Sequence, residues 1–139
     1  MSYTIQELKV GQSESFSKTI TETDVYLFAG TTGDLNPAHV NEEYARNTRF
    51  GKRIAHGMLS AGLISTVLGT KLPGPGTIYL SQQVDFKAPV YFGDTITAVV
   101  EVEELMPEKN RVALHTYCRN QEGIIVVDGK AVVMPPVVV

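Results

Sequence analysis

Residues 32–39, Thr-Gly-Asp-Leu-Asn-Pro-Ala-His, bring an acid, an amide and an imidazole together in one short stretch of the chain. Asp34 and His39 are the candidates for chemistry, because positioned carboxylates and imidazoles are frequent partners in proton transfer to and from a reacting group. A plain connection between two helices needs only turn-forming residues. The concentration of functional groups therefore predicts general acid–base chemistry on a bound water.

The residues around the acid and the imidazole predict how the loop is held. Gly33 permits backbone conformations closed to most residues, and Pro37 fits the first position of a helix. Asn36 then falls on the N-cap, where its side chain can accept a hydrogen bond from the first turn. His39 would lie on that turn, near the positive end of the helix dipole. We therefore expect a lowered pKa for His39 and a neutral imidazole at neutral pH.

Other interpretations of this loop have to be weighed beside catalysis. Gly-Asp and Asn-Pro are ordinary turn signals, so each residue taken singly has a purely structural explanation, and only their conjunction favours chemistry. A metal site is a third alternative, since Asp and His are common ligands. The other histidines, however, lie far along the chain at His56 and His115, and Cys118 is the sole cysteine. We therefore expect no metal at this site.

Caps and apolar spacing predict a short helix on each side of the loop. Thr21 or Thr23 can cap the first helix, and Asn41 can cap the second, which ends before the basic segment 49–53. Residues 57–72 carry almost no charge before Lys71, which predicts a helix buried on nearly all sides.

Five stretches predict β-strands. Their residues alternate in polarity or are rich in Val, Ile, Thr, Tyr and Phe, and they cover residues 14–20, 77–87, 94–105, 111–120 and 124–134. Short connections between the later strands favour antiparallel neighbours. A buried helix beside an antiparallel sheet is an α+β arrangement.

The loop also carries a family resemblance. Residues 28–39, Phe-Ala-Gly-Thr-Thr-Gly-Asp-Leu-Asn-Pro-Ala-His, closely resemble the signature of the MaoC-like, R-specific enoyl-CoA hydratases. Residues 53–59 resemble the start of that family's central helix, and residues 74–80 and 86–90 resemble its following strand. The resemblance covers nearly the whole chain. It implies a single hot-dog domain over residues 1–139, in which an antiparallel β-sheet wraps around one long central α-helix.

The resemblance also implies an activity and its residues. The activity is the reversible conversion of a trans-2-enoyl-CoA to an R-3-hydroxyacyl-CoA, with Asp34 and His39 as the catalytic pair and without cofactor or metal. Asn36 and Gly57 are implied to serve substrate binding, Asn36 by positioning the loop and Gly57 by holding the thioester carbonyl with its backbone N–H. Without the resemblance, the sequence favours a simple helix-start glycine at position 57 and a structural role for His56. His115, on a predicted strand, is also expected to be structural.

Two other functions and one further site remain open. A 3-hydroxyacyl-carrier-protein dehydratase would use similar chemistry, whereas a non-catalytic acyl-thioester-binding hot-dog protein would not need an acid–base pair. The basic segment 49–53 is either a solvated loop or a site for the phosphates of a nucleotide-bearing thioester. The resemblance further implies a homodimer, with the acyl-CoA tunnel near its interface, and a higher homo-oligomer is also open.

Bulk properties restrict the partners. The chain has 139 residues and a formal net charge of −3, which gives no electrostatic reason to bind nucleic acid. It contains no run of about 20 apolar residues, so we expect no membrane association. Its first residues do not resemble a signal peptide, and its lone cysteine favours a reducing compartment. We therefore expect a cytoplasmic protein.

Overall fold

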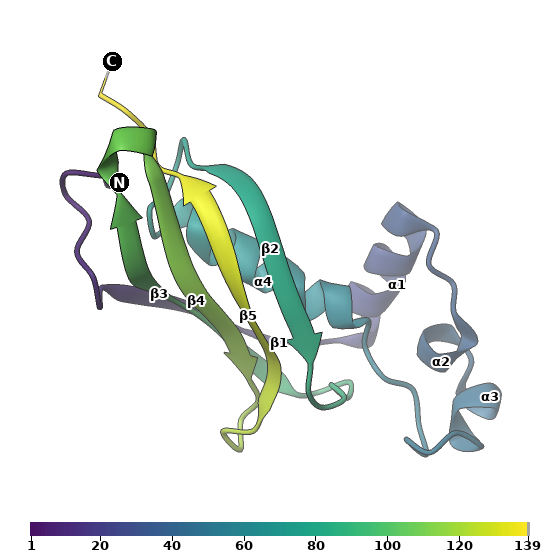
Figure 1. The fold of residues 1–139 in the computed structure, drawn as a ribbon. Coiled ribbons are helices and arrows are strands. Elements are labelled where there is room, and N and C mark those ends of the chain that lie inside the picture. The colour runs from purple at the N-terminus through teal and green to yellow at the C-terminus, as the bar shows by residue number, and fades with distance from the viewer. Residues whose placement is uncertain (139) are drawn as a thin grey trace.

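The computed structural model describes residues 1–138 and contains one antiparallel sheet packed against one long helix (Figure 1). The strands follow the spatial order β1-β3-β4-β5-β2. This is the hot-dog arrangement that the resemblance implied. The strand bounds lie within two residues of the predicted ones: β1 Ser13–Thr19, β2 Ile78–Phe86, β3 Thr95–Met106, β4 Arg111–Arg119 and β5 Ile125–Met134.

The long helix α4, Gly57–Thr70, supplies the core that the sheet covers. Its side chains Ile64, Val67 and Leu68 are at most 1% exposed and belong to the main hydrophobic cluster. The expectation that this helix is buried on nearly all sides is wrong. Met58 is 58% exposed, and the small residues Gly62 and Ser65 lie on the same uncovered face, because one sheet covers only one side of a helix.

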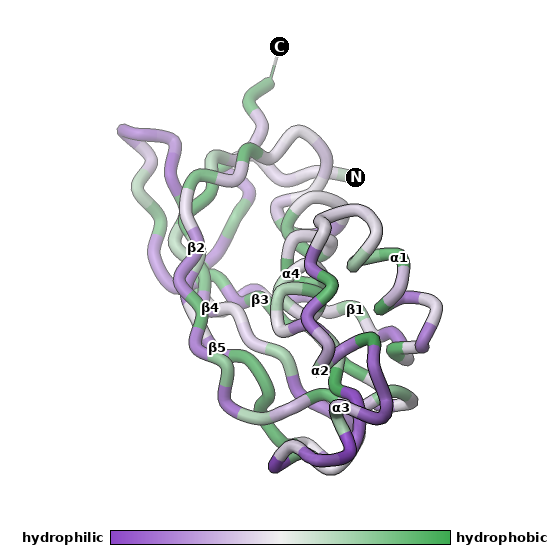
Figure 2. The backbone as a smooth tube through the Cα atoms, turned by 90° about the vertical axis from the view of Figure 1, so that its right-hand side faces the viewer, coloured by the Kyte–Doolittle hydropathy of each residue, from purple (hydrophilic) through white to green (hydrophobic). Residues whose placement is uncertain are grey.

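Three shorter helices gather beyond the N-terminal end of α4 (Figures 1 and 2). They are α1 Glu22–Thr32, α2 Pro37–Val40 and α3 Glu42–Arg46. Thr21 caps α1 in a reciprocal capping box with Asp24, and Asn41 caps α3 through a bond from Tyr44 N of 3.0 Å. Local capping chemistry thus starts the helices where the sequence predicts.

The connection between β2 and β3 departs from the expected pattern. β2 pairs with β5 at the edge of the sheet and not with β3, because β1 and β4 already occupy both sides of β3. Residues 87–94 therefore connect the edge strand β2 to β3, although β5 and β4 lie between these two strands in the sheet. On the way, Val90 O accepts a 2.8 Å hydrogen bond from Ala55 N, and Tyr91 bridges to Ile54. This crossing fixes the segment that leads into α4.

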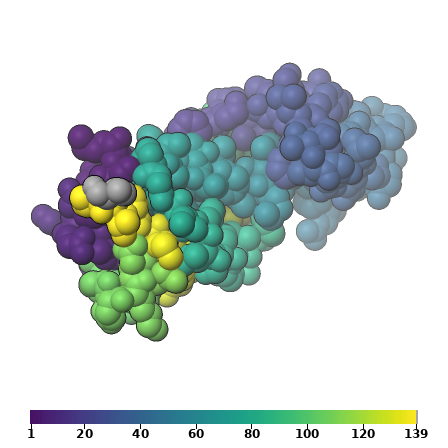
Figure 3. Space-filling model, turned by 90° about the horizontal axis from the view of Figure 1, so that it is seen from above, coloured from purple at the N-terminus to yellow at the C-terminus, as the bar shows by residue number. Residues whose placement is uncertain are grey.

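The molecule is elongated (Figure 3). The helices α1 to α3 form one end, and the N-terminal residues and the end of β5 lie together at the other. Within residues 1–138, no helix combines the length and the apolar character that crossing a membrane requires.

Candidate active site

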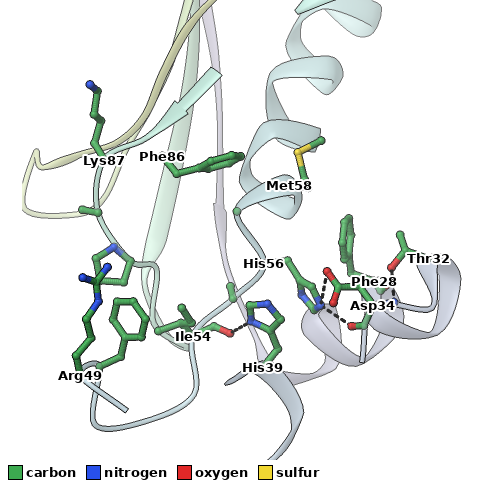
Figure 4. A pocket seen from close by; sticks show the side chains of 15 residues that line it. Phe28, Thr32, Asp34, His39, Arg49, Ile54, His56, Met58, Phe86 and Lys87 are labelled. Carbon is green, nitrogen blue, oxygen red and sulfur yellow. Dashed lines mark hydrogen bonds and ion pairs between the residues drawn. The ribbon is translucent and has the colours of Figure 1, made fainter. Parts of the chain in front are cut away.

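The loop after α1 is ordered by bonds within itself. Gly33 ends α1 in the left-handed conformation, with φ 81°. Asp34 N donates to Thr32 Oγ1 at 3.1 Å, and Asn36 N donates to Asp34 Oδ1 at 3.3 Å. Asn36 Oδ1 accepts from Ala38 N at 3.0 Å, so Asn36 is the N-cap of α2, as predicted. The Asp34 carboxylate lies toward the His56 ring, with its Oδ2 4.0 Å from His56 Nε2 (Figure 4).

His39 lies on the short helix α2 and is only 9% exposed. Its Nδ1 is 2.7 Å from the backbone oxygen of Ile54. Since a carbonyl oxygen can only accept, Nδ1 carries the proton, and Nε2 of the neutral ring keeps its lone pair. Burial lowers the pKa of His39, and the neighbouring His56 lowers it further, against the raising effects of Ile54 O and Asp34. The expected direction is therefore confirmed, with burial as the main cause.

The two predicted catalytic side chains converge, and a third joins them. Asp34, His39 and His56 each offer an atom that lies within 4.8 Å of the others. The His39 and His56 rings stack with their centroids 3.8 Å apart, while the Asp34 side chain remains half exposed (Figure 4). Sequence reasoning assigned His56 a structural role; its adjacency to Gly57 was the only signal that it would lie here.

These three side chains line a pocket of about 590 Å³, a volume typical of small-molecule sites. Gly57, at the first turn of α4, lines it together with Phe86 at the end of β2. A Cβ atom at Gly57 would lie 2.6 Å from the Phe86 ring, so only glycine fits without movement. The backbone N–H groups in the first turn of a helix have no partner within that helix. In α4 this first turn, at Gly57 and Met58, lines the pocket.

Two other predicted positions lie elsewhere. Asn36 is exposed and does not line this pocket; its contacts are those of a cap. His115 lies on the sheet, where its Nε2 is 2.7 Å from Asp128 Oδ1, which agrees with the expected structural role.

Comparison with known proteins places this site in a family. Residues 6–121, which include Asp34, His39 and Gly57, match the family described as the MaoC like domain. The chain belongs to this family. It is 59% identical over 131 residues to the (R)-specific enoyl-CoA hydratase of Rhodospirillum rubrum, an alignment that covers 94% of this chain and 90% of that protein.

A solved structure and a carrier-protein relative extend the comparison. The unliganded R-hydratase PhaJ1 of Pseudomonas aeruginosa superimposes with a TM-score of 0.91 at 50% identity, covering 96% of this chain and 85% of that one. A mitochondrial 3-hydroxyacyl-(acyl-carrier-protein) dehydratase of Solanum lycopersicum is 37% identical over 131 residues, covering 93% of this chain and 78% of that protein. The R. rubrum hydratase is thus considerably more similar than this carrier-protein relative.

The cluster of the MaoC-like site also has the donor types of a metal centre. Two imidazoles and one carboxylate are a known set for divalent transition metals. Two of the four ring nitrogens are already bound to backbone oxygens, His39 Nδ1 to Ile54 O and His56 Nε2 to Asp34 O. His56 Nδ1 has no hydrogen-bond partner among the described residues but is buried. His39 Nε2 and the Asp34 carboxylate are the remaining acceptors, and that pair is equally suited to holding a water.

The structure separates the members of the basic segment 49–53. Arg53 is neutralised by ion pairs with Glu22 and Glu42, and Lys52 lies over the ring of Tyr91 at 4.6 Å. Arg49, in contrast, lines the pocket.

A second basic residue, Lys87, lines the same pocket although it lies outside this segment. Figure 4 shows Arg49 and Lys87 on the side of the pocket away from Asp34. The positive charge near the site thus comes from two different segments of the chain.

A second cavity of about 400 Å³ begins where the first ends. Met58 lines both cavities, so the two adjoin at the start of α4. The second cavity runs between the uncovered face of α4 and β2, along Ala61, Gly62 and Ser65 on one side and residues 79–82 on the other.

Proposed function

We propose that this protein catalyses the reversible, R-specific hydration of trans-2-enoyl-CoA to R-3-hydroxyacyl-CoA. The observation that carries the proposal is the convergence of His39 and Asp34 in one pocket, opposite the first turn of a long helix. The 59% identity to an (R)-specific enoyl-CoA hydratase supports the same reaction. On this basis the protein is a hydro-lyase, and an acyl-CoA thioester is its substrate.

The acid–base pair accounts for the addition of water. The His39 Nε2 lone pair and the Asp34 carboxylate are both acceptors, so one can take a proton from the water while the other orients it. The water oxygen forms a bond to C3 as its O–H bond breaks and its proton passes to the acceptor. The C2=C3 π bond breaks, its electron pair moves toward the thioester oxygen, and a proton is then delivered to C2. Positioned acid–base groups of this kind contribute about 10²–10⁴-fold in rate.

Gly57 accounts for the charge that develops on the thioester oxygen. Its N–H lies at the positive end of the α4 dipole, beside the acid–base pair. One preorganised donor aimed at such an oxyanion is worth about 3–4 kcal/mol. The close approach of Phe86 explains why this position holds a residue without a side chain.

The cavities and charges suit the two ends of an acyl-CoA. The second cavity, past Met58, is largely apolar and takes the acyl chain. The cations Arg49 and Lys87 lie on the side away from Asp34 and suit the phosphates of the nucleotide. The thioester then lies between them, beside Gly57.

The decisive experiment measures the loss of conjugated-enoyl absorbance when purified protein meets crotonyl-CoA, followed by chiral analysis of the product. We expect the R alcohol from the wild type and losses of about 10²–10⁴-fold in kcat for Asp34→Asn and for His39→Ala. The variant His115→Ala, on β4 and outside the pocket lining, serves as the control and should keep full activity. An inactive wild type that still binds enoyl-CoA would instead favour a non-catalytic acyl-thioester-binding protein.

A carrier-protein dehydratase is the second candidate, supported by the 37% identical relative from S. lycopersicum. Its chemistry would be the same, and only the carrier of the acyl thioester would differ, a carrier protein in place of CoA. Crotonyl-CoA and crotonyl-carrier protein compared at equal concentration separate the two. Under the CoA proposal, kcat/KM is higher for crotonyl-CoA, and the reverse order would overturn it.

We also propose that the working form is a homodimer in the cytoplasm. The uncovered face of α4 and the edge strand β2 expose apolar side chains that a second copy would cover, among them Met58, Ile78 and Leu80. The lone cysteine, Cys118, is buried, which suits a reducing compartment but does not require one. Cell fractionation tests the location, and the mass in solution tests the dimer.

A further inference from the structure

His56 is a buried side chain that the proposed reaction does not use. It occupies the N-cap position of α4 and is 2% exposed, yet its side chain makes no capping hydrogen bond. The side chain of an N-cap residue commonly accepts a hydrogen bond from a backbone N–H in the first turn of its own helix. His56 instead directs its ring away from α4, toward the loop that carries Asp34 (Figure 4).

The contacts of the His56 ring reach both members of the acid–base pair. Its Nε2 lies 2.9 Å from the backbone oxygen of Asp34 and 4.0 Å from the carboxylate oxygen Oδ2 of the same residue. One ring face stacks on His39, with centroids 3.8 Å apart and planes inclined by 31°. Phe28 packs against the same ring at 4.7 Å.

The bond to Asp34 determines which nitrogen carries the proton. Because the backbone oxygen can only accept, Nε2 is the donor. Nδ1 is buried and has no hydrogen-bond partner among residues 1–138. The ring therefore uses one nitrogen for the loop and its face for His39.

The Asp34 loop depends on this contact for its position relative to α4. The other bonds of Asp34 join it to Thr32, at the end of α1, and to Asn36 in the same loop, and neither bond reaches α4. The bond from His56 crosses 22 residues and joins the loop to the residue directly before Gly57. It therefore holds the carboxylate in register with the first turn of α4.

From these contacts we infer that His56 is a positioning residue, which holds Asp34 and His39 at fixed distances from each other and from the Gly57 N–H. The inference rests on the proposed hydration and adds a residue to it. His56 touches neither water nor substrate in this assignment. It acts through the two side chains that do.

Two substitutions separate the hydrogen bond from the ring. His56→Phe keeps a stacking ring and removes the donor, whereas His56→Gln supplies an amide donor at a similar reach. Small misplacements of catalytic groups can cost about 100-fold in rate. We expect kcat for crotonyl-CoA to fall about 10- to 100-fold in His56→Phe, with KM changed less than about threefold, and we expect His56→Gln to recover a substantial part of kcat.

The matched control is His115→Phe, which removes a half-buried histidine of β4 that is hydrogen-bonded to Asp128 and does not line the pocket. It should leave kcat and KM unchanged. Wild-type kcat in folded His56→Phe would overturn the inference, as would equal losses in His56→Phe and His56→Gln. Either result would show that the donor does not position the pair.

A measurement on the wild type covers the case in which His56→Phe does not fold. Nitrogen-15 NMR of the imidazoles should show His56 protonated at Nε2 and unprotonated at Nδ1, and protonation at Nδ1 instead would overturn the inference. The same preparation is assayed with crotonyl-CoA. An inactive wild type would refute the proposed hydration, whereas an active wild type with an Nδ1-protonated His56 would refute this inference alone.

Discussion

At the scale of single residues, His39 is prepared for proton transfer by its surroundings. The bond from Nδ1 to Ile54 O fixes the orientation of the ring, which lines the pocket, and leaves the Nε2 lone pair unprotonated. Burial, which is the largest cause, and the neighbouring His56 both penalise the charged form, and together they outweigh the favourable effects of Ile54 O and the Asp34 charge. The imidazole therefore stays neutral at a pH where a solvent-exposed histidine would begin to gain a proton.

This arrangement predicts the pH dependence of the reaction. The pKa of His39 is lowered from 6.5, so the ring remains a proton acceptor as the pH falls through 6.5 and is protonated only at lower pH. We expect kcat/KM for crotonyl-CoA to be above half of its plateau value at pH 6.5 and to decline at lower pH. The profile is measured between pH 5 and pH 8. A half-maximal point at or above 6.5 would contradict the prediction.

Gly57 gives the second prediction at this scale. Gly57→Ala forces the Phe86 ring or the start of α4 to move, because the new Cβ would lie 2.6 Å from the ring. We expect kcat to fall about 10- to 100-fold, since the N–H donor moves with the helix start. Gly69→Ala is the control on the same helix: its Cβ meets no atom within 4 Å. Equal kcat values for the two variants would argue against a role for the Gly57 N–H.

The sequence predicts the chemical groups of the site more completely than it predicts their geometry. Asp34, Asn36 and His39 occupy one local motif, in which caps and turn preferences act between near neighbours, and the structure builds the loop accordingly. His56 is 22 residues from Asp34, and its contact arises only when α4 packs beside the loop. No local pattern encodes such a contact, so sequence reasoning gave His56 a purely structural role.

At the scale of elements the same division holds. The capping residues Thr21, Asn36 and Asn41 set helix starts through short-range bonds. Asn36 and Asn41 were predicted as caps, and Thr21 was one of two candidates, together with Thr23. The uncovered face of α4 and the pairing of β2 with β5 were not, because both depend on how distant segments compete for the same side of the sheet. Apolar composition predicts that a helix packs, but not how much of it one sheet can cover.

The two connections that line the pocket on the side away from Asp34 give a third prediction. Arg49 and Lys87 come from different connections and line the same pocket, without an ion-pair partner in residues 1–138. Replacing both by alanine should raise KM for crotonyl-CoA about three- to tenfold with little change in kcat, as expected for exposed charge contacts. KM for crotonyl-pantetheine, which lacks the nucleotide, should not change.

Lys52→Ala is the control for this pair, since Lys52 belongs to the same basic segment but lies over Tyr91 and does not line the pocket. Added salt should raise the wild-type KM for crotonyl-CoA toward that of the double variant, because exposed charge interactions are screened. A KM that rises equally for crotonyl-CoA and crotonyl-pantetheine would show that the two cations do not recognise the nucleotide.

At the scale of the whole molecule, the two edges of the sheet differ in character. The edge strand β1 exposes mostly polar side chains, including Ser13, Ser15 and Ser17, and hydrophilic side chains are one way in which proteins protect an edge from further pairing. The opposite edge, β2, exposes the apolar residues Ile78 and Leu80, which are 54% and 42% accessible. An exposed apolar edge beside the uncovered face of α4 favours association through β2.

This asymmetry predicts which single substitution dissociates the proposed dimer. Light scattering of the wild type should give twice the 15.2 kDa mass of the chain, and Ile78→Lys should shift the mass toward one chain by placing a charge in the interface. Ser13→Lys, on the polar edge, should leave the mass unchanged. Dissociation by Ser13→Lys but not by Ile78→Lys would place the interface on β1. Because the second cavity lies between α4 and β2, dissociation should also lower activity on medium-chain enoyl-CoAs more than on crotonyl-CoA.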